Sequence, residues 1–214
     1  TGLSPNTPGW NDTFGLKGGR AKEGILIRGV DVKVINCNTT YFNNLKKRAV
    51  AIRTDGRCCF SGLVQNSYIR YCWGGISLED IVTDWSIIDT TILDLTKFGV
   101  SVGFDWNKMK QTDFTGDNFR ISRCLIENVN NAMNENKKIG NGYAIFLARG
   151  SLINITDTYI EDYDAEEGHF AYGIYANGIT DGSRLLQLNL LRNNVGSESK
   201  GSISIYLENQ WYGN

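Results

Sequence analysis

Apolar and polar residues alternate with a period of two in short segments along most of this chain. Segments 85–95, 119–129 and 153–163 share the pattern apolar-x-apolar-x-x-small-x-Ile-x-Asn/Asp-apolar. Alternation of this period predicts β-strands, and no segment combines a 3.6-residue period with helix-capping residues. The sequence therefore predicts an all-β protein.

Two motifs recur six times in the same order along the chain. The first has the anchor positions Thr39, Ile69, Ile92, Ile126, Ile160 and Leu191, spaced 23 to 34 residues apart. The second, a small residue followed by apolar-x-apolar, occupies 50–52, 76–78, 100–102, 145–147, 174–176 and 205–207. Short strands repeating at this distance predict stacked coils, each pairing with its neighbours at about 4.8 Å.

Polar and small residues also recur at fixed places in the first motif. An Asn/Asp column contains Asp94, Asn128, Asp162 and Asn193, and a small column contains Cys37, Ser67, Thr90, Cys124, Thr158 and Asn189. Asn and Asp tolerate a left-handed backbone, and stacked copies can form hydrogen bonds along the stack. An antiparallel sandwich of short strands is the alternative, but it would not require the same columns to recur.

With these motifs, the sequence resembles the right-handed parallel β-helix of pectate-lyase-like proteins, and most of all bacteriophage tailspikes and capsular depolymerases. The resemblance covers roughly residues 24–210 and implies about six coils, with 1–23 an irregular N-terminal segment and 211–214 a tail. It also implies glycan binding or cleavage, a homotrimer, and a place on a virion tail or outside the cell. We expect the chain to be a fragment of a longer protein.

Composition sharpens this interpretation. The chain has 24 Gly and 22 Asn, but its two Pro residues are Pro5 and Pro8, which favours uninterrupted strand pairing. A net charge of −1 gives no basic footprint for nucleic acid, and no apolar stretch is long enough to span a membrane. Five cysteines without CxxC spacing and a single histidine predict buried thiols rather than disulfides, and neither a metal site nor a cofactor.

Loops of variable length flank the second motif, so we expect them to wall a groove whose floor is the outward face of that strand. Outward positions place Phe146, Tyr175 and Tyr206 on three successive coils. Such an aromatic stack suits the apolar face of a sugar ring. It is also typical of a subunit interface, or of packing under a loop.

Acidic residues near this floor suggest glycoside hydrolysis. A glycosidase needs two carboxyl groups about 5–10 Å apart, a distance that residues on adjacent coils can meet. We expect Glu79 to act with Asp105 or Asp80, because these carboxylates lie around the boundary between the second and third coils.

Further residues complete the expected binding groove: Arg53, Trp73, Trp106 and Glu208. Arg53 could bind the carboxylate of a uronate or sialate, or it could pair with Glu79. The leading hypothesis is a domain that binds and hydrolyses bacterial surface polysaccharide. The alternatives are a non-enzymatic, receptor-binding fibre domain and a polysaccharide lyase.

Three weaker site hypotheses remain. Glu127 and Glu161 lie one above the other and have the spacing of a retaining carboxylate pair. His169 could serve as a lyase base, although a lone loop histidine is more often incidental. A calcium site is conceivable from the acidic residues Asp162, Asp164, Glu166 and Glu167.

Overall fold

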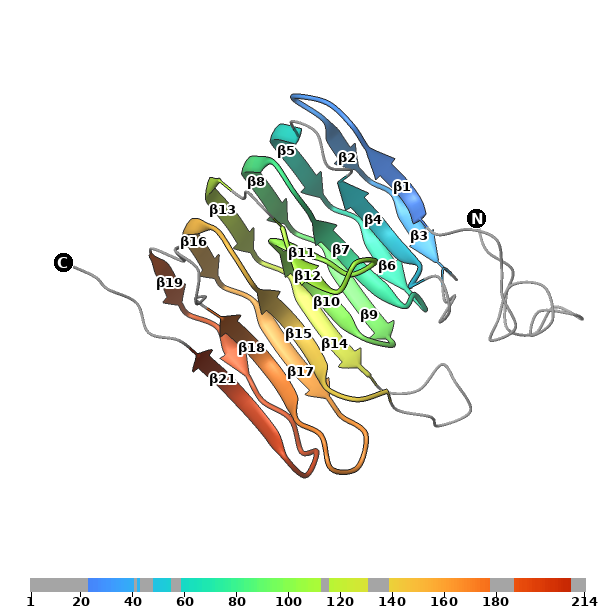
Figure 1. The fold of residues 1–214 in the computed structure, drawn as a ribbon, viewed down its shortest axis with the longest axis vertical. Helices are drawn as coiled ribbons and strands as arrows, with labels where there is room; N and C mark the ends of the chain where they lie inside the picture. Colours follow the sequence, from blue (N-terminus) through green and yellow to red (C-terminus); the bar gives the residue numbers. More distant parts are fainter. Residues whose placement is uncertain are drawn as a thin grey trace, which may run out of the picture.

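A computed structural model describes residues 23–40, 42, 48–54, 59–112, 116–130, 139–177 and 187–208. This part of the chain forms three long parallel sheets and contains no helix. The strands visit the sheets in a fixed order, and each round of three makes one coil of a stack that runs from blue to red in Figure 1. In the described residues no helix meets the length and hydropathy needed to cross a membrane.

The seven-stranded sheet, here sheet A, contains β1 (Glu23–Ile27), β4 (Val50–Thr54), β7 (Gly74–Leu78), β10 (Phe98–Val102), β15 (Gly142–Leu147), β18 (Ala171–Asn177) and β21 (Ser202–Glu208). Sheet B contains β2 (Lys33–Ile35), β5 (Cys59–Gln65), β8 (Val82–Ile88), β13 (Asp117–Ser122), β16 (Ser151–Thr156) and β19 (Leu188–Leu191). Sheet C contains β3 (Asn38–Thr40), β6 (Tyr68–Arg70), β9 (Thr91–Leu95), β14 (Leu125–Val129), β17 (Tyr159–Tyr163) and β20 (Asn194–Val195).

This architecture is a parallel β-helix of six coils, with β21 as the first strand of a further turn. It confirms the predicted fold, and the sandwich alternative is wrong because the long sheets are parallel throughout. In the described residues, antiparallel pairing is confined to a hairpin of β11 (Phe104–Asp105) and β12 (Lys110–Gln111). The handedness and the domain limits at 24–210 stay predictions.

One column of apolar side chains from each sheet fills the interior. Sheet C contributes the predicted anchor column, in which Ile69, Ile92 and Ile126 are in register and fully buried. Sheet A contributes Ile52, Ile76, Val100, Ile145 and Ile174 in the same way. Each coil therefore buries the apolar residues that a single turn of chain would leave exposed.

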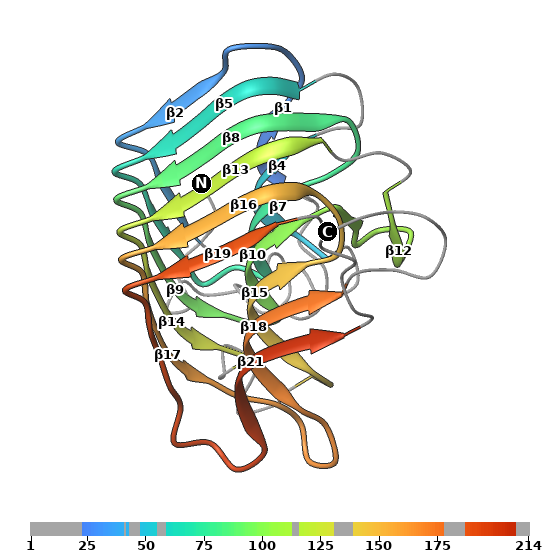
Figure 2. The same ribbon diagram turned by 90° about the vertical axis from the view of Figure 1, so that its left-hand side faces the viewer.

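The corner between sheets B and C is the most regular part of the fold, and it forms one straight edge in Figure 2. Its column, Asn36, Asn66, Asp89, Arg123, Asp157 and Arg192, has φ between 47° and 55° throughout. Asn and Asp adopt this left-handed conformation readily, whereas arginine does not. Each arginine here is held by a bidentate pair with the aspartate one coil earlier, at 2.6 and 2.9 Å for Arg123 and Asp89.

The predicted Asn/Asp column is confirmed in three of its four members. Asp94, Asn128 and Asp162 have φ of 52°, 56° and 50°, and Asn128 donates to Asp94 at 3.0 Å. These residues lie inside strands of sheet C rather than at a corner, so they kink the strand. The first motif thus spans two sheets, with the tight corner between them.

The sixth copy of the first motif was aligned wrongly, by four residues. The anchor column ends at Val195, not Leu191, and the small column ends at Asn193, whose side chain accepts from the Thr158 amide at 3.0 Å. Asn189 instead pairs with Asn154 in sheet B. The local sequence Leu191–Arg192–Asn193 imitates the motif, but the hydrogen bonds of the preceding coil select the other register.

Free thiols are found at all four described cysteines, and three are buried as expected. Cys37, which is partly exposed, and Cys124 belong to the small column, while burial raises the pKa of the Cys72 thiol to about 12. Cys58, the fifth cysteine, lies outside the described residues. These thiols are packing residues rather than nucleophiles.

Candidate functional site

The outer face of sheet A carries the predicted aromatic stack. Its register runs Arg53, Ser77, Ser101, Phe146, Tyr175 and Tyr206. The rings of Phe146 and Tyr175 lie 5.2 Å apart and 2° from parallel, and those of Tyr175 and Tyr206 lie 5.5 Å apart at 14°. Each inner ring is therefore partly covered by its neighbour, and within the described residues the stack ends at Tyr206.

A second aromatic column lies beside the first, and sequence analysis missed it. Phe98, Tyr143 and Tyr172 are in register three residues before the first column, and the two tyrosines stack at 5.4 Å and 8°. The signal was present, since each residue opens a copy of the second motif. The sequence-based motif began one residue later, at the small residue, and so left the aromatic position out.

The β11–β12 hairpin covers the middle strands of this face. Trp106 of the hairpin stacks on Phe98 at 4.8 Å, and its indole donates to the Ser101 hydroxyl at 2.8 Å. Together with its neighbours it forms a buried cluster, the covered patch: Val50, Trp73, Phe98, Trp106, Phe146 and Ala148. At its Phe146 end the aromatic stack packs under a loop, which is the third of the three roles that the sequence suggested for it.

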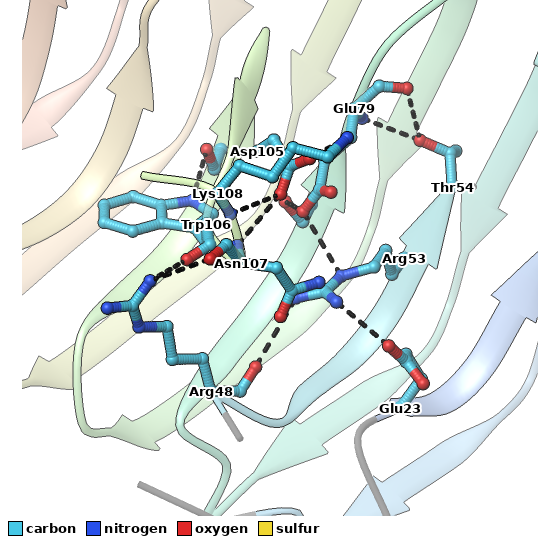
Figure 3. A network of polar contacts seen from close by, with 11 residues as sticks. Glu23, Arg48, Arg53, Thr54, Glu79, Asp105, Trp106, Asn107 and Lys108 are labelled. Atoms are coloured by element: carbon cyan, nitrogen blue, oxygen red, sulfur yellow. Dashed lines mark hydrogen bonds and ion pairs between the residues drawn. The ribbon is translucent and has the colours of Figure 1, made fainter. Parts of the chain in front are cut away.

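Hydrogen bonds on both sides hold the hairpin against the rest of the protein. Arg48 donates to the carbonyls of Trp106 and Asn107, the latter at 3.3 Å (Figure 3). On the other side, Gln111 donates to the Ala148 carbonyl at 3.2 Å and Arg149 donates to the Thr112 carbonyl at 2.8 Å. The hairpin is thus part of the folded body.

Beyond the hairpin the same face is partly exposed, although Tyr172 is buried against the rings of its aromatic neighbours. We call this the open patch: Tyr143, Phe170, Tyr172, Tyr175 and Tyr206. Phe170 is 51% exposed and Tyr206 is 36% exposed, whereas Phe146 in the same column as Tyr206 is 7% exposed. In the described chain, ring contacts reach Tyr206 only from Tyr172 and Tyr175. Tyr206 therefore presents the accessible end of the stack.

Polar groups border the open patch. Asn177 and Glu208 are neighbours in register at the ends of β18 and β21. Tyr175 donates a short hydrogen bond to Glu208, and Asn177 donates to the Tyr175 hydroxyl at 3.3 Å. Burial, followed by Glu208, raises the pKa of Tyr175 far above its usual value, so its hydroxyl stays protonated.

A buried ionic cluster lies on the covered half (Figure 3). Arg53, 3% exposed, contacts Glu23 at 2.9 Å and Glu79 at 3.2 Å, and also donates to the Arg48 carbonyl at 3.4 Å. The contact with Glu79 is an ion pair without hydrogen-bond geometry, because the Arg53 Nε has no hydrogen-bond partner. Arg53 is the register neighbour of Ser77. The sequence-based alignment had placed Arg53 beside Glu79, two residues further along β7.

Glu79 is the most strongly perturbed acid of this cluster. Its carboxylate accepts a hydrogen bond from Ser77 at 2.7 Å, and its backbone is tied to Thr54. Burial raises the pKa of Glu79 to about 7, against the opposing effects of Arg53 and Ser77, and the charges of Asp105 and Asp80 add to the rise. A carboxyl group of this kind can hold a proton near neutral pH.

Asp105, the expected partner of Glu79, serves the hairpin turn. It accepts hydrogen bonds from the amides of Asn107 and Lys108 at 2.9 and 3.0 Å, and it pairs with the Lys108 ammonium at 2.9 Å. Burial acts to raise the pKa of Asp105, but these contacts outweigh it and the pKa lies below its usual value. Asp80 lies in the bend after β7, with φ of 59°.

The structure thus brings together Glu79, Asp105 and Arg53, but buries them, and Trp73 and Trp106 are buried beside them. Tyr206 and Glu208 lie apart from this half, on β21, while Tyr175 joins the two because it packs against the covered patch and stacks on Tyr206. The predicted groove floor is therefore two regions, one covered and one open. The catalytic role of Glu79, Asp105 and Asp80 stays a prediction.

The weaker site hypotheses fare as follows. Glu127 and Glu161 are register neighbours, as expected, and burial followed by Glu161 raises the pKa of Glu127. His169 lines an open pocket of about 620 Å³ between the connections leading into β18 and β21. Within the described ranges no group of three or more His, Cys, Asp or Glu residues is placed to hold a metal ion.

No protein-family model, no curated protein and no solved structure matches this chain.

Proposed function

We propose that this β-helix binds a polysaccharide through the open patch of sheet A. The observation that carries the proposal is the aromatic stack that ends, partly exposed, at Tyr206 beside the polar pair of Asn177 and Glu208. Exposed aromatic surface bordered by polar side chains is unusual on a protein that needs no partner. Sugar rings suit it because they offer apolar C–H faces to the rings and hydroxyl groups to the polar border.

Bacterial surface polysaccharide is the ligand we favour, because the coil repeat resembles that of phage tailspikes. On this proposal the domain acts on a virion tail or outside the cell, as part of a homotrimer. The resemblance carries the location and the assembly, while the open patch carries the binding.

The test is binding of the chain to immobilised capsular and O-antigen polysaccharides. Tyr206→Ala removes the end of the stack and should reduce binding at least about tenfold. Tyr159→Ala is the matched control, because Tyr159 is 41% exposed but lies on sheet C. Equal loss in both variants, or in neither, would contradict the proposal.

A subunit interface is the competing use of the same patch. Light scattering separates the two: a trimer that dissociates when Tyr206 is replaced, while glycan binding persists, assigns the patch to assembly. Loss of glycan binding with the oligomeric state unchanged assigns it to the ligand.

Hydrolysis at Glu79 is a second candidate function, favoured by its pKa of about 7. A general acid must hold its proton at the working pH, which Glu79 does and Asp105 does not. Cleavage would require the hairpin to leave the covered patch, because Glu79 is 5% exposed. If Glu79→Gln releases as many oligosaccharide ends as the unmodified chain, this candidate is wrong.

A further inference from the structure

The open patch is bordered by acidic and amide groups, and this bears on the charge of its ligand. At the end of the stack, Glu208 is held by Tyr175 and lies beside Asn177. At the opposite end of β18 and β21, where these strands begin, a pocket is lined by Asp164, Glu166 and Glu167, in addition to His169 and Lys200. A carboxylate-bearing sugar placed here would meet like charges at close range, which costs affinity.

In the part of the chain that the structure describes, three cations on or beside sheet A are already engaged. Arg53, the sequence-based candidate for binding a uronate, is buried between Glu23 and Glu79 on the covered half. Arg149 donates to the Thr112 carbonyl. An arginine that recognises a carboxylate needs free donors in its planar fork.

Lys97 lies beside Tyr143 of the open patch, and it is engaged as well. Its ammonium donates to the carbonyl groups of Ile139, at 3.2 Å, and of Asn141. It also lies 5.4 Å from the centre of the Tyr143 ring. Burial lowers the pKa of Lys97 to about 8, against the opposing effect of Glu166.

We infer that the ligand of the open patch is an electrically neutral polysaccharide, built of sugars with free hydroxyl pairs and without carboxylates. The inference rests on the proposed function and narrows its substrate class. Glu208 accepts hydrogen bonds from the hydroxyls, the amide of Asn177 adds a polar contact, and the stack ending at Tyr206 takes the apolar face of a ring. A carboxylate acceptor favours hydroxyl donors and repels uronates and sialates.

The experiment compares each neutral polysaccharide with its own carboxylated form. The probes are neutral capsular and O-antigen polysaccharides, next to the same polymers after oxidation of their primary hydroxyls to carboxylates. Retardation in polymer-containing gels measures the affinity of the intact chain. We expect the oxidised polymer to bind at least about tenfold more weakly at low salt, with a smaller difference at high salt.

Two variants assign the discrimination to the border of the patch. Glu208→Gln removes the charge but keeps an acceptor, so it should narrow the gap between the neutral and the oxidised polymer. Lys33→Gln is the control, because this exposed lysine lies on β2 of sheet B, away from the open patch. Circular dichroism confirms that both variants retain the sheet.

The failures of the two proposals are distinguishable. Equal or tighter binding of the oxidised polymer, with loss in Tyr206→Ala, would overturn the neutral-ligand inference and leave glycan binding in place. A gap unchanged in Glu208→Gln would overturn the role of Glu208 and with it the inference. Absence of binding to either class would overturn the proposed function and the inference together.

Discussion

The covered and open patches occupy the same columns of the same sheet, yet one is sealed and the other faces solvent. Phe146 and Tyr206 are two coils apart in one aromatic column, and their exposed fractions are 7% and 36%. Two features separate them: Trp106 of the β11–β12 hairpin covers Phe98 and Phe146, and Tyr206 lies on β21, the edge strand of sheet A. A regular scaffold can therefore carry a covered and a partly exposed region on one face.

The largest expected effect on stability concerns Trp106, which covers the buried aromatic residues. Trp106→Ala removes ring contacts to Trp73, Phe98 and Phe146 and the hydrogen bond to Ser101. We expect the free energy of unfolding to fall by about 3–5 kcal/mol, the usual cost of truncating a buried aromatic residue. Urea denaturation measures it, and a loss below about 1 kcal/mol would show that the covered patch is no core.

The next prediction concerns the pH dependence of the covered half. Because the pKa of Glu79 in the folded chain is about 7, above its unfolded value near 4.5, its protonated form stabilises the fold at low pH. That contribution is complete below about pH 4.5 and is lost as the pH rises through about 7, by up to about 3 kcal/mol. Glu79→Gln should abolish this part of the pH dependence in urea titrations between pH 4 and 8.

Asp105→Asn is the control, because Asp105 contributes to the pH dependence of stability with the opposite sign. The pKa of Asp105 is lowered in the fold, so its contribution is present above its usual pKa and is lost as the pH falls. A variant in which stability still falls from pH 4.5 to 7 despite Glu79→Gln would contradict the role given to Glu79.

Two glycines with left-handed backbones allow the packing of the covered and open halves to be compared. Gly103, with φ of 77°, opens the hairpin, and a Cβ there would lie 2.6 Å from the Arg149 Cβ and 2.8 Å from its amide nitrogen. Gly168, with φ of 81°, has no atom within 4 Å of that position. Gly103→Ala should cost about 2 kcal/mol or more and Gly168→Ala about 1, since both pay for the left-handed backbone. Equal melting temperatures for the two variants would contradict the close packing of the hairpin.

The smallest effect on stability is expected at the open patch. Tyr206→Ala should lower the free energy of unfolding by less than about 1 kcal/mol, because the ring is partly exposed and ends the stack. This variant pairs a small change in stability with the loss of glycan binding. A stability loss as large as that of Trp106→Ala would mean that Tyr206 belongs to the core.

The sequence was sufficient for the fold because each coil repeats the same physical requirement. Ile92, Ile126 and Ile160 must all point inward, and a column of identical needs is visible without a structure. The alignment failed in the sixth coil, where Arg192 takes the left-handed position that Asp157 takes below it. The Asp157–Arg192 ion pair makes this substitution tolerable, and such pairing between coils is not a property of either residue alone.

The site was harder to predict than the fold. Phe146 and Tyr206 have equivalent positions in the repeat, but Trp106 of the β11–β12 hairpin contacts Phe146, and Tyr206 lies on the edge strand of sheet A. Arg53 and Glu79 were expected to interact, and they do, but as a buried cluster with Glu23 rather than at a surface. Periodicity reports which way a side chain points, but not what an irregular loop lays over it.

The corner between sheets B and C has a consequence for how such a molecule can diversify. From Ile69 to Ile92 a coil takes 23 residues, while from Asp94 to Asn128 it takes 34, and the corner is the same in both. In the longer coil the added residues include the hairpin after β10, which lies over sheet A. Because loop closure costs little more as a loop lengthens, such segments can be exchanged without altering the register below or above. The corner thus stays constant from coil to coil, and loops with new surfaces can be exchanged without changing it.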